Sequence, residues 1–380
     1  MRFLSRSVFR LVPVASFIGA PLASVARGEA FEGYRLMASF ALPPGAAAFD
    51  DLEEGRLIAI VADGIYRETG VGSRQFTAVG TLPGADIPSY GAAFIRVSPD
   101  GLLLAIGNNG GAFGSNYQVG VFDLDTLSGT WFSAGHFDGA WVDNNRVAVT
   151  YGDFVNPSIV SILDVTSPDP ENPVNTTVID SIGGASGGIA LDADGNLFTG
   201  NGFQFAGPSG TGTIKAFSLS DWTGALTGTA LNFETEGTLV IDILSASPID
   251  FDSDGNLFVG GGDFSSADHD FVGLVRGAAI AGALAGGGPV NPADPLSVRR
   301  LDPDATDDSN FYSAVFNGTT KELYVRSAGS DAVFVYRDLT GIPAASAWGL
   351  LCMVCALGII GTLLLGSAPA RPTEYGKVSP

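Results

Sequence analysis

The sequence predicts an all-β fold for most of its 380 residues. Glycine and proline are abundant, with 52 and 21 residues, and the segments between them are rich in Val, Ile, Phe and Thr. These segments are short and show no sustained 3.6-residue periodicity, which is typical of strands joined by turns. Strands of this length are stable only in sheets of several strands, so many of them must pair.

A repeated phrase divides this region into similar units. Each copy has a short apolar strand, a turn containing Asp with Gly or Asn, and a second strand that begins with an aliphatic residue; copies four (189–200) and five (249–260) are nearly identical. The aliphatic residues are Leu57, Leu103, Val147, Leu197, Leu257 and Leu323. The first three intervals fit the roughly 40–50 residues of a four-stranded propeller blade, and the last two need longer loops. Six copies predict a six-bladed β-propeller over residues 31–339, with a seven-bladed or irregular ring as the alternative.

The two ends of this region are expected to close the ring. A lone strand at 34–42 precedes the first copy of the phrase, and the last copy is followed by only enough sequence for about three strands before Leu339. We therefore predict that the first strand completes the last blade. A ring closed in this way has no free sheet edge.

The N-terminal residues 1–30 resemble a secretory signal peptide in their organisation. Three arginines precede an apolar run from Leu11 to Ala26, and small residues follow up to Ala30. A basic start, a short apolar run and small residues at the cleavage site are the features of such a leader. The sequence thus predicts export of the propeller.

A second apolar segment lies near the C-terminus and carries no charge from Leu350 to Leu365. It is long enough for a transmembrane helix, which we place at 348–366, after a tether at 340–347 and before a cytoplasmic tail at 367–380. Both cysteines of the chain, Cys352 and Cys355, fall inside this segment. The predicted propeller therefore has no disulfide and depends on burial of its core.

The net charge of −21 limits the partners of the protein. So acidic a surface disfavours nucleic acid and attracts cations. Two turns have the Asp-x-Asp-Gly-Asn order that begins many calcium loops, and their carboxylates are Asp192, Asp194, Asp252 and Asp254. No Glu follows at the twelfth position, as an EF-hand requires, and Asp-Gly is a strong hairpin signal. A hairpin turn is the favoured interpretation, with Ca²⁺ as the one candidate cofactor.

Polar residues recur just beyond the second strand of several copies. They are Asn108, Asn109, Asp153, Asn201 and Asp263. Such residues either line one face of the ring, where propellers bind ligands around the central channel, or are repeated copies of one turn. They are the candidate ligand-binding residues.

The phrases IALDADGNLFTG and IDFDSDGNLFVG resemble those of bacterial propellers of the NHL and SMP-30/gluconolactonase type. This resemblance covers the body of the chain and implies the propeller fold. Lactonases of that group hold a metal with acidic and Asn ligands that converge on the channel. Those ligands cannot be matched to this sequence residue by residue.

The tail resembles the IPTL-CTERM and PEP-CTERM sorting signals of Gram-negative bacteria. The matching residues are Ile342, Pro343, Ser346, Trp348 and Gly349, followed by the apolar run. Tails of that kind usually end in an arginine cluster, whereas here Glu374 separates Arg371 from Lys377. The resemblance implies a sorting peptidase as a partner, and an envelope location with the C-terminus anchored or released after processing. An ordinary single-span anchor is the alternative.

Two functions follow as hypotheses. The first is an exported, envelope-associated propeller that binds or scaffolds an extracellular protein or a glycan, without an enzymatic activity of its own. The second is a calcium-dependent hydrolase or lactonase that uses carboxylates of the channel.

Overall fold

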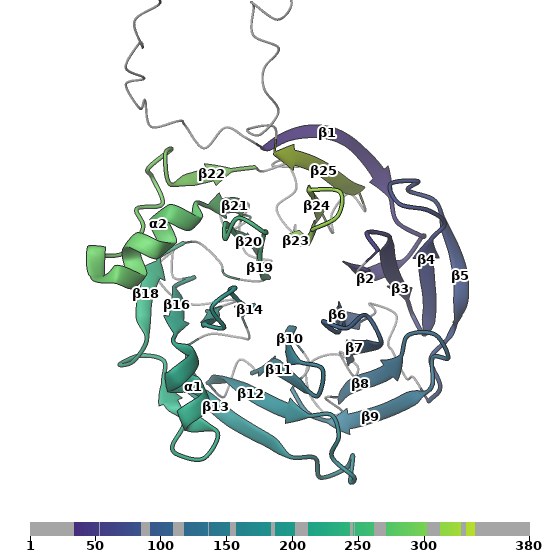
Figure 1. Ribbon diagram of the computed structural model, residues 1–380, viewed down its shortest axis with the longest axis horizontal. Coiled ribbons are helices and arrows are strands. Elements are labelled where there is room, and N and C mark those ends of the chain that lie inside the picture. Colours follow the sequence, from purple (N-terminus) through teal and green to yellow (C-terminus); the bar gives the residue numbers. More distant parts are fainter. Residues whose placement is uncertain are drawn as a thin grey trace, which may run out of the picture.

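The computed structural model describes residues 34–52, 54–84, 92–108, 118–135, 137–152, 157–183, 187–201, 212–243, 246, 248–261, 271–301, 312–327 and 332–338. Within these residues, six sheets lie around one axis, each with four antiparallel strands, which confirms the six-bladed β-propeller (Figure 1). Each predicted phrase supplies the first two strands of one blade. The innermost strands are β2, β6, β10, β14, β19 and β23 (Figure 1).

The first three blades follow the chain in order. Blade 1 contains β2 (Ala46–Asp51), β3 (Leu57–Val61), β4 (Gly64–Glu68) and β5 (Phe76–Thr81). Blade 2 contains β6 (Ala92–Val97), β7 (Leu103–Asn108), β8 (Gln118–Asp123) and β9 (Gly129–Ser133). Blade 3 contains β10 (Gly139–Asp143), β11 (Arg146–Tyr151), β12 (Ser158–Asp164) and β13 (Asn175–Ile182), and β17 (Leu231–Asn232) adds a parallel fifth strand.

The last three blades include two helical insertions. Blade 4 contains β14 (Ile189–Leu191), β15 (Leu197–Gly200), β16 (Ile214–Phe217) and β18 (Thr238–Ile241), with α1 (Leu219–Ala225) after its third strand. Blade 5 contains β19 (Ile249–Phe251), β20 (Leu257–Gly261), β21 (Phe271–Val275) and β22 (Val298–Arg300), with α2 (Gly277–Gly282) and the π-helical turn η2 (Ala283–Gly287) at the same place. Blade 6 contains β23 (Tyr312–Asn317), β24 (Glu322–Ser327), β25 (Ala332–Asp338) and β1 (Tyr34–Ala41). The long loops expected in blades 4 and 5 thus contain helices, which were too short to show a helical period in the sequence.

The hydrophobic core is divided among the interfaces between blades. The described residues form six clusters of buried side chains, and each cluster combines side chains of two neighbouring sheets. In the cluster between blades 1 and 2, for example, Ile58 and Ile60 pack with Leu104 and Ile106. A single blade would expose such a face, so the ring is stable only when every blade has both neighbours.

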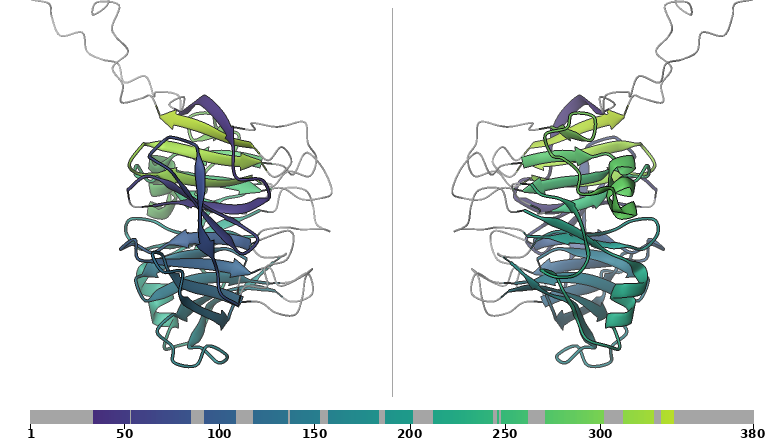
Figure 2. Two further views of the ribbon diagram at one scale, coloured as in Figure 1. Left: turned by 90° about the vertical axis from the view of Figure 1, so that its right-hand side faces the viewer. Right: turned by 90° about the vertical axis from the view of Figure 1, so that its left-hand side faces the viewer.

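Ring closure follows the prediction that the first strand completes the last blade. β1 pairs antiparallel with β25, and Tyr34 lies opposite Asp338 (Figure 1). The views from the side show the two strands together at one edge of the disc (Figure 2). Phe40 of β1 packs against Phe76 of blade 1 and against Tyr324 of blade 6, with ring centroids 6.4 and 6.1 Å away. The strand therefore joins the last blade to the first.

No helix in the part of the chain that the structure describes is both long and apolar enough to cross a bilayer. The predicted leader at 1–30, the tether and sorting residues at 340–347 and the transmembrane helix at 348–366 all lie outside the described residues. These three assignments remain predictions from the sequence.

Candidate functional site at the propeller axis

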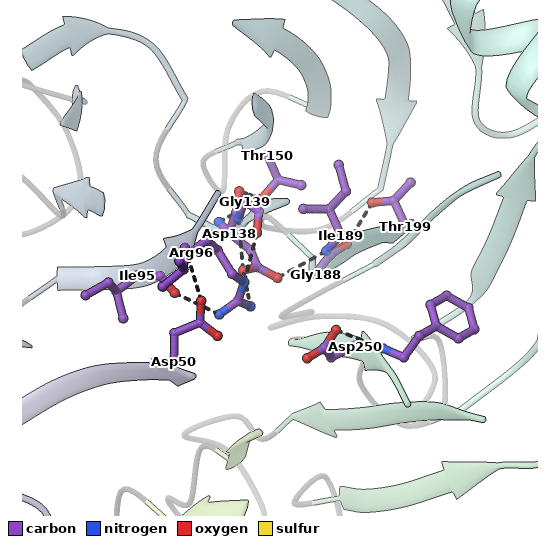
Figure 3. A network of polar contacts seen from close by, with 12 residues as sticks. Asp50, Ile95, Arg96, Asp138, Gly139, Thr150, Gly188, Ile189, Thr199 and Asp250 are labelled. Atoms are coloured by element: carbon purple, nitrogen blue, oxygen red, sulfur yellow. Dashed lines mark hydrogen bonds and ion pairs between the residues drawn. The ribbon is translucent and has the colours of Figure 1, made fainter. Parts of the chain in front are cut away.

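Charged side chains from four blades meet near the axis of the ring. Asp50 and Asp51 come from β2, Arg96 from β6, and Asp250 from β19, while Asp138 directly precedes β10. We call these five residues the axial cluster. In Figure 3, Arg96 lies between Asp50 and Asp138, and Asp250 lies across from them. The cluster places one guanidinium among four carboxyl groups.

Arg96 is held by both ionic and backbone contacts. Its Nη2 donates to Asp138 Oδ1 at 3.0 Å, and its Nε donates to the Gly139 carbonyl at 3.0 Å (Figure 3). Its Nη1 donates to the Ile95 carbonyl at 3.1 Å. The guanidinium thus joins the inner strand of blade 2 to that of blade 3 with a defined orientation.

The aspartates extend this connection to the neighbouring blades. Asp50 Oδ2 accepts the backbone N–H of Val97 at 2.7 Å, which joins blade 1 to blade 2. Asp138 Oδ2 accepts the backbone N–H of Ile189 at 3.1 Å, which joins blade 3 to blade 4 (Figure 3). Thr150 Oγ1 accepts the N–H of Asp138 at 3.0 Å and fixes the start of this segment. Together with the ion pair, these contacts link the first four blades around the axis.

Burial raises the pKa values of the four aspartates and so favours their neutral, protonated form. It raises the pKa of Asp50 to about 7, although Arg96 and the Val97 N–H act in the opposite direction. Burial and the nearby Asp50 raise the pKa of Asp51 to about 8, and burial raises the pKa of Asp250 to about 6. Burial also raises the pKa of Asp138, against the effect of Arg96. Four carboxylates around one guanidinium cannot all ionise at low cost.

We expect the folded protein to lose stability as the pH rises from about 5 to about 8. The folded state retains protons on Asp50, Asp51 and Asp250, which the unfolded chain releases near pH 4. Stability falls with pH wherever the folded state binds more protons than the unfolded state. The free energy of unfolding should be at least about 2 kcal/mol lower at pH 8 than at pH 5. Urea titrations of a chain spanning residues 31–338, at constant ionic strength, measure this difference.

The matched control is the double substitution Asp50→Asn and Asp51→Asn. The amide oxygen at position 50 can still accept the Val97 N–H, but neither side chain titrates. This variant should show a clearly smaller change in stability between pH 5 and pH 8. An equal change in the two proteins would contradict the assignment of the protons to this cluster.

The two Asp-x-Asp-Gly-Asn turns have the same hydrogen bonds in blades 4 and 5. Asp192 accepts the N–H groups of Asp194 and Asn196, and Asn196 Nδ2 donates to its second oxygen at 2.8 Å. Asp252 has the same contacts with Asp254 and Asn256. Gly195 and Gly255 adopt φ of 78° and 76°, so the predicted hairpin turns are present. The first aspartate of each turn thus uses its oxygens to hold the turn.

The asparagine of each turn also binds the helix inserted in its blade. Asn256 Oδ1 accepts the N–H of Gly277, the first residue of α2, at 2.9 Å. Asn196 Oδ1 accepts the N–H of Leu219, the first residue of α1, at 3.4 Å. No group of three or more metal-ligating side chains is found among the residues that the structure describes. Calcium at these turns remains an untested prediction.

Among the described residues, Asp252 has a hydrogen-bond partner with no counterpart at Asp192, and this predicts unequal effects of substitution. The Tyr34 hydroxyl donates to Asp252 Oδ2 at 2.6 Å and so joins β1 to blade 5. Asp252→Ala should destabilise the protein by about 1.5–3 kcal/mol more than Asp192→Ala, because a buried hydroxyl loses a charged partner. Thermal unfolding with calcium and with a chelator measures both effects. Equal losses of stability in the two variants would contradict the role of Asp252 in holding Tyr34. A loss of stability on adding chelator that either substitution abolishes would show that the turn binds calcium and would also contradict it.

Two of the five candidate ligand-binding residues lie in the described structure. Asn108 ends β7 and is buried, and Asn201 follows β15. Asn201 Nδ2 donates to the Gly183 carbonyl at 2.8 Å, and its backbone carbonyl accepts the Ala246 N–H at 3.1 Å. Asn201 therefore has a structural role in blade 4. Asn109, Asp153 and Asp263 lie outside the described residues.

The strand directions place the two predicted sets of residues on opposite faces. The first two strands of blades 2, 4 and 5 are antiparallel, so the turn after the first strand and the end of the second strand are on opposite sides of the disc. The side with the turns after the first strands carries Asp192, Asp194, Asp252 and Asp254. The side where the second strands end carries Asn108 and Asn201. The structure does not bring the two sets together into one site.

Comparisons with solved structures find the same fold in proteins of low sequence identity. The PQQ-bound aldose sugar dehydrogenase of Streptomyces coelicolor is 12% identical, with a TM-score of 0.54 over 80% of this chain and 97% of that chain. The PQQ domain of a pyranose dehydrogenase from Coprinopsis cinerea is 12% identical, with a TM-score of 0.51 over 81% of this chain and 96% of that chain. No family model and no curated protein matches the sequence. The likeness supports the β-propeller body and, at this identity, only its fold.

The axial cluster was not predicted from the sequence, although a signal for it was present. Aligned copies of the phrase read Ile95-Arg96-Val97, Ile189-Ala190-Leu191 and Ile249-Asp250-Phe251. The middle residue of the three is thus the positively charged Arg96 in one inner strand, the negatively charged Asp250 in another, and Ala190 in the third. A charge between two apolar residues in an inner strand of a ring points toward other inner strands, where it must find a partner.

Proposed function

We propose that the protein is an exported β-propeller of the cell envelope, tethered through its C-terminus, that acts as a binding or scaffolding module. The observation that carries this proposal is the pairing of Tyr34 with Asp338. It brings both ends of the propeller to one point on its rim. A tether that continues from Asp338 would hold the ring by its edge and leave both faces of the disc accessible to partners.

The contacts at the axis indicate that charged side chains of the axial cluster stabilise the ring. Asp50 and Asp138 each accept a backbone N–H of the next blade, and Arg96 bridges two blades. These side chains hold the ring together, and each of them already takes part in a contact between neighbouring blades. Binding on the faces, by a protein or a glycan, therefore fits the geometry better than chemistry at the axis. The acidity of the chain argues against nucleic acid as that partner.

The tethering is tested by expressing the complete chain in a Gram-negative host. We expect it in the membrane fraction, resistant to high salt and carbonate, and cleaved by protease added to spheroplasts. A matched chain that ends at Asp338 should appear instead as a soluble periplasmic protein. Membrane association of both chains, or protection of both from protease, would overturn the proposed topology.

The binding role is tested with the same truncated chain against arrays of bacterial glycans and by cross-linking in intact cells. Saturable binding to one glycan or one envelope protein, lost on unfolding, is the expected result. Absence of any saturable ligand in both experiments would overturn this part of the proposal.

A hydrolase is the second candidate function, and the raised pKa values of Asp50 and Asp250 favour it. Carboxyls that titrate near neutral pH are suited to general acid–base catalysis. Incubation with a panel of lactones, with and without Ca²⁺, tests this candidate. Turnover that Asp50→Asn or Asp250→Asn abolishes, in a variant that unfolds cooperatively, would establish the enzyme instead of the binding module.

A further inference from the structure

Two large apolar side chains are exposed next to each other on the outer strand of blade 6. Leu36 and Met37 of β1 have 54% and 50% of their surface exposed. Neighbouring strand residues normally point to opposite faces, but the pairing of β1 with β25 has an irregularity between Leu36 and Ala38. Met37 has no partner in β25, and this bulge allows both side chains to face solvent. We call Arg35, Leu36 and Met37 the rim patch.

The rim patch has a positive charge beside its apolar residues. Arg35 is exposed and lies directly opposite Arg337 of β25. Arg337 Nη2 is 2.6 Å from Oε1 of the buried Glu322, which balances one of the two charges. Arg35 thus brings an exposed guanidinium to this part of the rim, and Asp338 follows Arg337 at the end of β25.

The rim patch is also next to the point where the chain continues toward its predicted anchor. Asp338 lies opposite Tyr34, and Tyr336 lies opposite Leu36. Residues 339–347 then separate the ring from the apolar segment that begins at Trp348. Even fully extended, this tether reaches only roughly 30 Å. A membrane that held the apolar segment would therefore lie within reach of this edge of the disc.

We propose that the rim patch docks on the surface of an anionic phospholipid membrane, so that the ring stands with blade 6 toward the lipid. This inference rests on the proposed C-terminal anchoring. Arg35 binds lipid phosphates, while Leu36 and Met37 enter the interface between headgroups and acyl chains. Three features together favour a lipid surface as the occupant: the short tether, the arginine, and the apolar pair.

The electrostatics of the whole protein favour the same orientation. A chain with an excess of Asp and Glu is repelled by anionic headgroups over most of its surface. Repulsion of the other edges and attraction of Arg35 both turn the rim patch toward the membrane. The tether keeps the effective concentration of lipid high, so that a small patch is sufficient for contact.

The experiment uses the complete chain with Cys352→Ser and Cys355→Ser, reconstituted in vesicles of phosphatidylglycerol and phosphatidylcholine. The sequence contains no other cysteine, so Met37→Cys provides a single site for a polarity-sensitive fluorophore. The matched control is Val174→Cys, because Val174 is also apolar and 57% exposed but precedes β13 of blade 3, across the ring (Figure 1). Lipid-attached quenchers should quench the label at 37 several-fold more than the label at 174.

Arg35→Glu provides a second test in the same chain. It should reduce quenching at position 37 at least twofold in anionic vesicles and have little effect in vesicles of phosphatidylcholine alone. Equal quenching at positions 37 and 174, or no effect of Arg35→Glu, overturns the docking. A label at 37 that is already shielded in detergent solution indicates a second copy of the chain on this edge and also overturns it. A chain that does not float with the vesicles at all refutes the C-terminal anchoring. Failure of the anchoring is thereby distinguished from failure of the docking of the rim patch.

Discussion

Arg96→Met should destabilise the protein by about 3–5 kcal/mol at pH 8, which is among the largest effects expected for a single substitution. The guanidinium is the counter-ion of Asp138, whose side chain is 4% exposed, and it also binds two backbone carbonyls. Methionine fills a similar volume but leaves the carboxylate buried without a positive partner. Much of the cost should disappear at pH 5, since burial already raises the pKa of Asp138 and the loss of Arg96 would raise it further.

The control for this prediction is Arg146→Met. Arg146 forms an ion pair with Asp143 at 2.6 Å, but the two side chains are 37% and 43% exposed. A solvated pair of this kind contributes at most about 1 kcal/mol. Urea titrations of both variants at pH 5 and pH 8 provide the comparison. If Arg96→Met costs no more than Arg146→Met, or if its cost does not depend on pH, the axial cluster does not have the structural role described above.

The fold could be predicted from the sequence because its repeat is local. Each phrase contains two strands and the turn between them, and residues such as Gly195 and Gly255 impose the turn through their own backbone preferences. The closure by β1 also followed from counting strands in the last unit. The helix α1 escaped prediction because its seven residues cover less than two helical turns and its burial depends on packing against neighbouring strands.

The contacts of the candidate site were harder to predict because they join residues far apart in the chain. Asp138 binds Arg96 and the N–H of Ile189, and neither partner is near it in sequence. Only the order of the blades around the ring brings them together. Sequence analysis instead selected Asp192 and Asp252 as candidate metal ligands, because they belong to the Asp-x-Asp-Gly-Asn pattern. In the structure that pattern forms a hairpin turn. Local sequence signals thus identified turns, whereas the axial cluster depends on ring closure.

Deletion of β1, residues Tyr34–Ala41, should prevent the ring from closing and should leave the chain largely unfolded or aggregated. The strand supplies the fourth strand of blade 6 and the contacts of Phe40 with blades 1 and 6. Its loss also exposes the unpaired edge of β25 and removes the bond from Tyr34 to Asp252. We expect a loss of more than about 5 kcal/mol, which is comparable to the whole stability of many domains. Circular dichroism and calorimetry should show no cooperative transition.

A synthetic peptide with the sequence of residues 34–42 makes this prediction sharper. Added in excess to the deletion variant, it should restore a cooperative transition, because pairing with β25 is antiparallel and requires no covalent connection to β2. A peptide with Ser in place of Leu36 and Met37 is the matched control and should rescue equally well, since both side chains are exposed. A deletion variant that unfolds like the intact protein, or a peptide that never binds it, would mean that the ring is closed by other contacts. Rescue by both peptides would separate the two roles of this strand, with its backbone and Phe40 closing the ring and its exposed pair left free to contact lipid.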